Sequence, residues 1–309
     1  MIVALAGGVG AARFLDGLAR VVPPEELFII GNTGDDTEIY GLHISPDLDT
    51  VVYTLAGLAN RVHGWGLQGD TFHGLEALGR LGAETWFQLG DRDLATHIYR
   101  TGQLRAGRTL SAVTTDIAHS LGVRAIVRPM SDGPVRTLVR TPAGPLEFQT
   151  YFVRRRARDR VLGVNFRGAG GARPAPGLLA AIRRASAIIF CPSNPIISIG
   201  PILAVRGIRQ ALEARRSPAL AISPIVGGRA LKGPAARMMR GMGMKVSALG
   251  VAELYRGLVD VFVLDRADCK LAPAVEALGM RAVVTDTIMS GTPQKKALAR
   301  AAIRALGLA

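Results

Sequence analysis

The sequence predicts an α/β fold, built on a doubly wound and mostly parallel sheet with a small antiparallel and helical insert. A short apolar run, Ile2–Ala6, ends in glycines and leads into a segment with helical spacing, which is typical of a buried parallel strand and its helix. The alternation of strand and helix patterns returns after Pro176, which favours a sheet covered by helices. Two alternating segments flank Pro142-Ala143-Gly144-Pro145 and indicate a hairpin.

The first third of the chain begins with a strand–helix–strand unit and is then rich in helices. The predicted helix Ala11–Val22 has Phe14, Leu15 and Leu18 on one side and stops at two prolines, because the residue before a proline disfavours helical geometry. The remaining elements predicted here are the strands Leu27–Ile30 and Val123–Arg128 and the helices Thr50–Asn60, Thr71–Leu81 and Asp91–Thr101.

The middle of the chain has the pattern of an insert. Val135–Thr141 and Leu146–Val153 predict the hairpin, and Val161–Phe166 predicts a further strand. We therefore expect one domain, residues 1–309, with a helix-rich and hairpin insert over roughly residues 60–170. The parallel strands predicted after the insert are Ala187–Cys191, Ala219–Ser223, Val261–Leu264 and Ala282–Thr285.

The composition is that of an ordinary globular protein, with 49% apolar and 20% charged residues among 309. The first residues lack the basic region of a signal peptide, and no apolar run approaches the length of a membrane helix. Two distant cysteines, Cys191 and Cys269, argue against a disulfide framework and a cysteine-based zinc site. We therefore expect a cytoplasmic protein that does not bind a membrane.

The net charge of +14 suits an anionic small substrate, a nucleic acid or a membrane surface. The arginines are spread along the chain except for the run Arg154-Arg155-Arg156, which a solvated face or loop also explains. Few aromatic residues lie within that run, so it does not resemble a stacking platform for single strands. We expect no nucleic-acid partner.

Five carboxylates fall within fifteen residues of this basic chain: Asp35, Asp36, Glu38, Asp47 and Asp49. Crowded carboxylates repel one another, whereas a divalent cation such as Mg²⁺ takes oxygen ligands and shares them with substrate phosphates. A divalent-cation site is therefore a hypothesis, which phosphate-binding segments nearby in the sequence would support. The alternative at Asp49 is that it, or Ser45, merely caps the following helix.

Glycines at the end of the first strand provide a candidate phosphate site. Gly7, Gly8 and Gly10 stand where a strand turns into a helix, so the backbone could approach a pyrophosphate at the positive end of a helix dipole. The dinucleotide fingerprint fits poorly, because Arg13 occupies the position of its third glycine. A tight turn without a ligand is the structural alternative.

Two later strand ends carry similar segments. Ser193, Asn194 and Ser198 offer polar donors after the strand Ala187–Cys191, and we expect a second anion or base contact there, although a capped turn explains the same residues. Lys232, after the next strand, could supply a point charge for a phosphate or be an ordinary surface lysine.

The helix-rich region adds a few weaker candidates. Arg92 and His97 could reach a ligand from a helix that Asp91 is suited to cap. Trp65, between two glycines, could stack on a flat ring or anchor its loop, and Asp132 could serve a site or an Asx turn.

Taken together, these segments resemble the 2-phospho-L-lactate transferase family (CofD-like), which assembles the deazaflavin coenzyme F-420. The resemblance covers nearly the whole chain, and its most specific motifs are Ser-Pro-Asp-Leu-Asp-Thr and Pro-Ser-Asn-Pro followed by Ser-Ile-Gly-Pro. The segments that carry it are Gly7–Gly10, Asn32–Asp36, Ser45–Thr50 with Val51–Gly57, Gly64–Gly66, Leu89–His97, Pro129–Asp132, Phe148–Val153, Pro192–Pro201, Ser223–Pro234 and Ala248–Ala252.

The resemblance implies a Rossmann-like fold, usually dimeric, and a Mg²⁺-dependent transfer onto the acceptor Fo (7,8-didemethyl-8-hydroxy-5-deazariboflavin). A ribityl hydroxyl of Fo would attack the phosphorus that bears the lactyl, enolpyruvyl or glyceryl group of a guanosine diphosphate donor, and GMP would leave. The sequence does not assign one of these three donors. Residues 7–10 and 148–151 also depart from the commonest family forms, so Thr150 is uninformative.

The resemblance also implies roles for individual residues. Asp36 and Asp49 would hold the metal, and Asp49 could also orient or deprotonate the attacking hydroxyl. The expected ligand-binding residues are Gly7, Gly8, Gly10, Asp47, Thr50, Tyr53, Trp65, Arg92, His97, Ser193, Asn194, Ser198, Gly200 and Lys232.

The alternative from another class is a non-catalytic regulator of the same fold that binds nucleotide sugars. The intact acidic motif Ser45–Thr50 and the loop Gly64-Trp65-Gly66 favour the enzyme, because a pure sensor does not need them.

Overall fold

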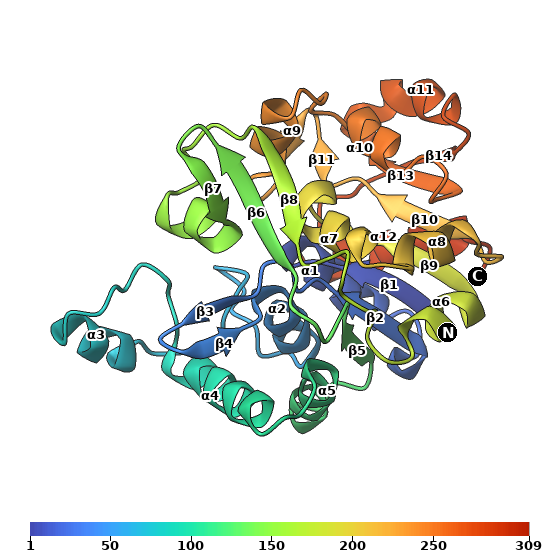
Figure 1. The fold of residues 1–309 in the computed structure, drawn as a ribbon. Coiled ribbons are helices and arrows are strands. Elements are labelled where there is room, and N and C mark those ends of the chain that lie inside the picture. Colours follow the sequence, from blue (N-terminus) through green and yellow to red (C-terminus); the bar gives the residue numbers. More distant parts are fainter. Residues whose placement is uncertain (309) are drawn as a thin grey trace.

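The computed structural model describes residues 1–308 and confirms the predicted fold class. Seven parallel strands form the central sheet in the order β14-β13-β10-β9-β1-β2-β5 (Figure 1). In chain order they are β1 (Ile2–Ala6), β2 (Leu27–Gly31), β5 (Ile126–Pro129), β9 (Ala187–Phe190), β10 (Ala219–Ile222), β13 (Val261–Asp265) and β14 (Arg281–Thr285).

The direction of winding reverses at β1. This strand pairs in parallel with β2 on one side and with β9 on the other. The chain adds β2 and β5 in one direction and then returns to add β9, β10, β13 and β14 in the other. Ligands of open α/β sheets bind beside such a switch point, at the carboxyl ends of the strands. The segments after Ala6 and after Phe190 are therefore placed side by side at the expected binding edge.

Twelve α-helices surround the sheet within residues 1–308. They are α1 (Val9–Leu18), α2 (Pro46–Leu55), α3 (His73–Arg80), α4 (Asp91–Arg105), α5 (Leu110–Ser120), α6 (Leu178–Arg184), α7 (Gly200–Ala204), α8 (Ile208–Glu213), α9 (Ala235–Gly241), α10 (Ala248–Leu254), α11 (Ala272–Glu276) and α12 (Thr292–Ala305). Short 3-10 turns η1 (Pro24–Glu26) and η4 (Arg266–Leu271) and π-helical turns η2 (Thr150–Arg154) and η3 (Pro195–Ile199) complete the set.

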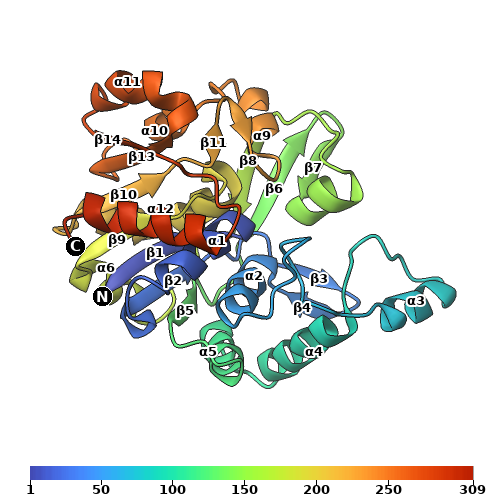
Figure 2. The same cartoon turned by 180° about the vertical axis from the view of Figure 1, so that it is seen from behind.

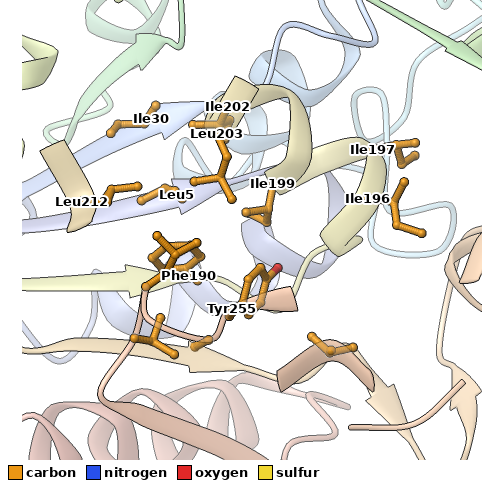
Figure 3. Packing of buried hydrophobic residues seen from close by; sticks show 14 of the residues in the cluster. Leu5, Ile30, Phe190, Ile196, Ile197, Ile199, Ile202, Leu203, Leu212 and Tyr255 are labelled. Carbon is orange, nitrogen blue, oxygen red and sulfur yellow. The ribbon is translucent and has the colours of Figure 1, made fainter. Parts of the chain in front are cut away.

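The sheet has a hydrophobic core on each face. On one face α1 and α12 lie side by side against the strands (Figure 2). A Cβ at Gly17 would lie 2.3 Å from the Lys295 carbonyl oxygen, and Lys295 Nζ lies 2.8 Å from Asp16 Oδ2. On the other face Phe190 and Tyr255 pack with ring centroids 5.1 Å apart among the apolar side chains of Figure 3. Burial on both faces explains why the inner strands β1, β9 and β10 are continuously apolar.

Three small antiparallel sheets stand outside the central one. β6 (Arg136–Thr141) pairs with both β7 (Gly144–Glu147) and β8 (Gly163–Arg167). The predicted second limb of the hairpin, Leu146–Val153, was wrong in its extent, because the chain turns into η2 after β7. The other pairs are β3 (Thr37–Ile39) with β4 (Leu42–Ile44) and β11 (Ile225–Val226) with β12 (Arg229–Ala230).

The observed start of α2 matters for the site. The sequence places this helix at Thr50–Asn60, but it begins at Pro46, a first-turn position that proline suits. Asp47 and Asp49 therefore lie in the first turn of α2 rather than in a loop before it. Within residues 1–308, every helix is too short or too polar to cross a membrane.

Candidate active site

A cavity of about 730 Å³ opens at the carboxyl edge of the central sheet. Its wall combines the turn after β1, the first half of α2 and the segments that follow β9, β10 and β14. The loop around Trp65 and residues of α4 close one side, and Phe148 to Val153 close another. The cavity thus lies beside the switch point between β1 and β9.

Most of the predicted site residues meet in this wall. Those that line the cavity are Gly8, Gly10, Asp47, Asp49, Thr50, Tyr53, Trp65, His97, Ser193, Asn194, Ser198 and Lys232. Gly7, Asp36, Arg92 and Gly200 are not among the lining residues. Arg92 is exposed and donates a hydrogen bond to the Gln68 carbonyl oxygen at 3.2 Å. Gly200 is the first residue of α7, directly after η3 in the sequence.

Asp36 is buried behind the cavity and is held by β4 and the residue after it. Its Oδ2 accepts a hydrogen bond from Ser45 Oγ at 2.9 Å and lies 2.9 Å from His43 Nε2. Its Oδ1 is buried and has no hydrogen-bond partner among residues 1–308. A buried carboxylate oxygen without a partner is costly, so Oδ1 is suited to a cation or another ligand.

Asp47 and Asp35 form the acidic floor of the cavity. Burial raises the pKa of Asp47 to about 7, a shift that a hydrogen bond from Asn32 Nδ2 opposes and the nearby Asp36 reinforces. Burial, together with the charge of Asp47, also raises the pKa of Asp35 well above its usual value. A bound cation would relieve this repulsion and favour ionised carboxylates.

Asp49 is anchored by a buried arginine. Arg100 donates through both terminal nitrogens to the two carboxylate oxygens of Asp49, and Nη1 to Oδ2 measures 3.1 Å. His97 Nδ1 lies 3.8 Å from the same Oδ2. Burial raises the pKa of Asp49, and Arg100 and His97 counter that rise only in part.

A second carboxylate, Asp93, continues this network along α4. Tyr53 donates its hydroxyl to Asp93 Oδ1 at 2.8 Å, and His97 Nε2 lies 3.3 Å from that oxygen. Burial alone would raise the pKa of Asp93, but its contacts with His97 and Tyr53 hold it below the usual value. Burial also raises the pKa of Tyr53, so its hydroxyl keeps its proton and donates.

Carboxylate and imidazole groups of this network fit a metal ion. Within residues 1–308, ligand atoms of Asp49, Asp93 and His97 all lie within 4.8 Å of one another. Oxygen-rich sites suit hard divalent cations. The guanidinium of Arg100 is paired with the carboxylate of Asp49, whereas Oδ1 of Asp36 has no hydrogen-bond partner within residues 1–308. That Asp36 and Asp49 share one ion stays a prediction.

The glycine-rich turn is shaped by close packing. The Gly7 amide donates to Ser193 Oγ at 3.2 Å, and a Cβ at Gly8 would lie 2.6 Å from Asp47 Oδ1. A Cβ at Gly10 would lie 2.2 Å from the Pro192 carbonyl oxygen. In the described part of the chain, no side chain caps the N-terminus of α1. Glycine is therefore required here for contact with neighbouring backbone and carboxylate, and the uncapped helix start can accept an anion.

Polar groups after β9 are used partly for structure. Asn194 Oδ1 accepts from the amides of Ile196 and Ile197 at 3.0 and 3.4 Å, which caps η3 as the structural alternative anticipated. Asn32, which was not among the predicted site residues, donates to Asp47 Oδ2 at 2.9 Å and to the Ile197 carbonyl oxygen at 3.2 Å. It ties the acidic floor to η3.

Lys232 joins two of the loops at the cavity mouth. Its Nζ donates to the His63 carbonyl oxygen at 3.3 Å. The His63 and Trp65 rings stack with centroids 5.3 Å apart, so the loop presents an exposed flat surface. Arg13 and Lys232 both line this part of the cavity. Burial, and then the nearby charge of Arg13, lower the pKa of Lys232.

Several lining residues were absent from the sequence-based site. They include Arg13, Phe87, Gln88, Asp93, Phe148, Gln149, Phe152, Thr287, Ile288, Met289 and Ser290. One signal could have found Asp93, since it stands four residues before His97 on the same helical face. The segment 287–290 follows the last strand of the sheet, and Asp265 Oδ2 holds the Thr287 amide and hydroxyl at 2.8 and 2.9 Å.

The sequence of this chain is similar to that of a known protein family. The family model "2-phospho-L-lactate transferase CofD" matches residues 2–300. The chain belongs to this family. It is 42% identical to the 2-phospho-L-lactate transferase of Methanosarcina acetivorans over 96% of both chains. It is also 44% identical to the phosphoenolpyruvate transferase of Streptomyces griseus, over 98% of this chain and 97% of the other.

A solved structure shows the same fold at low sequence identity. A UPF0052 family protein from Bacillus halodurans superposes with a TM-score of 0.65 and 15% identity, covering 97% of each chain. The CofD membership confirms the resemblance that the sequence motifs indicated.

Proposed function

We propose that this CofD family member transfers a phosphate-linked lactyl, enolpyruvyl or glyceryl group from a guanosine diphosphate donor to the ribityl hydroxyl of Fo, in the biosynthesis of coenzyme F-420. The hydroxyl oxygen forms a bond to the phosphorus that bears the acid, the bond from that phosphorus to the GMP oxygen breaks, and the hydroxyl loses its proton. The relatives named as 2-phospho-L-lactate and phosphoenolpyruvate transferases support this proposal.

One observation carries the proposal beyond family membership. The cavity beside the switch point combines a carboxylate cluster, an uncapped helix start and the cations Arg13 and Lys232. Phosphoryl transfer depends mainly on positioning and charge neutralisation, and these are the groups that such a cavity supplies. Aromatic side chains line the cavity at two places, Trp65 on one side and Phe148 and Phe152 on another, and such rings suit a flat ring system.

The roles of individual residues follow their positions. The amides at Gly8 and Gly10, with Lys232, would face the diphosphate, and Ser193, Asn194 and Ser198 would contact the guanosine side. Asp36 and Asp49 would hold Mg²⁺, which when bound neutralises phosphate charge. Asp49, on the first turn of α2, would orient the acceptor hydroxyl or take its proton.

We further propose that the enzyme works in the cytoplasm as a homodimer, without a nucleic-acid or membrane partner. Cross-linking or light scattering of the purified chain tests the dimer, and salt-dependent gel shifts test the expected lack of nucleic-acid binding.

The deciding experiment offers Fo, Mg²⁺ and each of the three activated donors to the purified protein. Liquid chromatography with mass detection should show one phosphodiester product and stoichiometric GMP for the preferred donor. Asp49→Asn is the matched control and should give little of either. GMP without a phosphodiester, or no turnover with any donor, would overturn the proposal. The regulator alternative would then regain support, since it predicts ligand binding without turnover.

A further inference from the structure

Helix α4 presents one buried polar face to the candidate site. Asp93, His97, Arg100 and Thr101 are the buried residues of this helix, and their spacing of four, three and one places them on one side. Only 2% of Arg100 is exposed, and no other arginine or lysine among residues 1–308 is as deeply buried. Such a buried charge is tolerated only when it is paired and hydrogen-bonded.

Arg100 has partners on α2, which carries Asp49, and on β4, whose His43 contacts Asp36. Its two terminal nitrogens bind the Asp49 carboxylate of α2. Nη1 also lies 3.4 Å from the His43 carbonyl oxygen on β4 and 3.2 Å from His97 Nδ1. Because a guanidinium nitrogen only donates, Nδ1 accepts, so a neutral His97 carries its proton on Nε2, toward Asp93.

His43 extends the influence of α4 to Asp36. The His43 amide donates to Thr101 Oγ1 at 2.8 Å, while the His43 carbonyl oxygen faces Arg100. Both peptide groups of His43 are therefore held by α4, and its ring meets Asp36 Oδ2 at 2.9 Å. The position of this ring helps to decide that Oδ2 is occupied and that Oδ1 of Asp36 stays free.

We propose that Arg100 is a positioning residue that fixes both carboxylates expected to hold the divalent cation, Asp49 directly and Asp36 through His43. A carboxylate on a free side chain rotates, whereas a two-point guanidinium contact fixes its plane. Lysine cannot reproduce this planar fork, although it keeps the charge. Ligands held in place by surrounding hydrogen bonds bind metal more tightly and more productively than unsupported ones.

This inference rests on the proposed function for its kinetic consequence but not for its binding consequence. The test uses Arg100→Lys in the full chain, with Arg108→Lys as control, since Arg108 forms an exposed ion pair with Asp116. Mn²⁺ serves as the probe, its binding measured by electron paramagnetic resonance with GDP present. Turnover is measured separately, and thermal melting shows how much protein is folded.

We expect Arg100→Lys to bind Mn²⁺ at least fivefold more weakly and to lower kcat at least tenfold, with the KM for Fo changed less than threefold. Arg108→Lys should behave like the wild type. A purely structural role for Arg100 predicts a lower melting temperature with unchanged Mn²⁺ affinity and kcat per folded molecule, and this result would overturn the proposal. So would a wild-type protein that binds no Mn²⁺.

A second variant covers the case in which Arg100→Lys does not fold. Thr101→Val is nearly isosteric and leaves Arg100 and its contacts with Asp49 in place. It removes the acceptor of the His43 amide and the local hydrogen bond from Thr101 Oγ1 to the His97 carbonyl oxygen, so it tests mainly the Asp36 branch. We expect Mn²⁺ affinity to fall at least threefold, and unchanged affinity would contradict the proposal. If the wild type turned over none of the three donors but the Mn²⁺ results held, the proposed function would fail and the positioning role would stand.

Discussion

Gly10 and Pro192 lie in direct backbone contact across the switch point of the sheet. A Cβ added to Gly10 would stand 2.2 Å from the Pro192 carbonyl oxygen. Gly10 belongs to the first turn of α1, and Pro192 follows β9 by two residues. The contact therefore joins the two strand ends between which the cavity opens, and it sets how closely the start of α1 approaches the segment that carries Asn194.

Gly10→Ala should destabilise the protein by about 2 kcal/mol or more, because overpacking against backbone cannot be relieved by a side-chain rotation. Gly102→Ala provides the matched control. Gly102 lies inside α4 with nothing within 4 Å of its added Cβ, so alanine there should add about 0.5–1 kcal/mol of stability. Urea unfolding measures both variants, and two changes of the same sign would contradict the packing argument.

The sequence predicts the central sheet well because burial on both faces leaves a plain signal. Ile2–Ala6 and Ala187–Phe190 are continuously apolar and entirely buried, so short apolar runs locate them. β3 and β4 are only three residues long and join at Tyr40 and Gly41, which have positive φ. Such short strands carry too little periodicity to be recognised.

The candidate site was predictable where it follows strand ends and less so where it depends on packing. Asp47, Asn194 and Lys232 lie after predicted elements and do reach the cavity wall. The sequence did not indicate Arg100 as a buried site residue, because an arginine on a helix is ordinarily exposed. Its burial arises only when α4 docks against β4 and α2, far away in the sequence.

Asp49→Asn should abolish most turnover while the protein still folds. We expect kcat to fall at least 100-fold, and unfolding free energy to fall by about 3 kcal/mol because Arg100 is left with a buried unpaired charge. Asp116→Asn, which removes the exposed partner of Arg108, is the control and should change neither quantity much. Wild-type rates of Asp49→Asn in the presence of Mg²⁺ would refute the assignment of Asp49.

Lys232→Ala should weaken GDP binding about tenfold and Fo binding less than threefold. The Lys232 ammonium contacts only a carbonyl oxygen in the described structure and lies near Arg13, so a diphosphate would be its natural partner. Lys270→Ala, at an exposed position outside the cavity, is the control. Calorimetric titration with GDP and with Fo makes the comparison, and equal losses for the two ligands would show that Lys232 does not belong to the donor side.

In the absence of divalent cations, the ionisation of Asp47 should lower the free energy of unfolding as the pH rises from about 4 to 7. Burial raises the folded pKa of Asp47 to about 7 from an ordinary 3.8, with Asp36 adding to the shift and Asn32 opposing it. Between these values the folded state holds a proton that the unfolded state releases. Linkage therefore lowers the unfolding free energy with pH, by at most about 1.4 kcal/mol per unit for one group. Asp35 shifts in the same direction.

Asp47→Asn removes this proton and should flatten the fall in stability, which urea unfolding at pH 5.0 and 7.5 would reveal. The carboxyl of Asp159 provides the opposite control, because its contact with Arg155 lowers its pKa. Asp159→Asn should therefore alter the pH dependence only below about pH 4, where the lowered carboxyl begins to take up protons. If Asp47→Asn and the wild type lose stability in parallel between pH 5.0 and 7.5, the proton is held elsewhere in the acidic floor, and Asp35 becomes the group to replace.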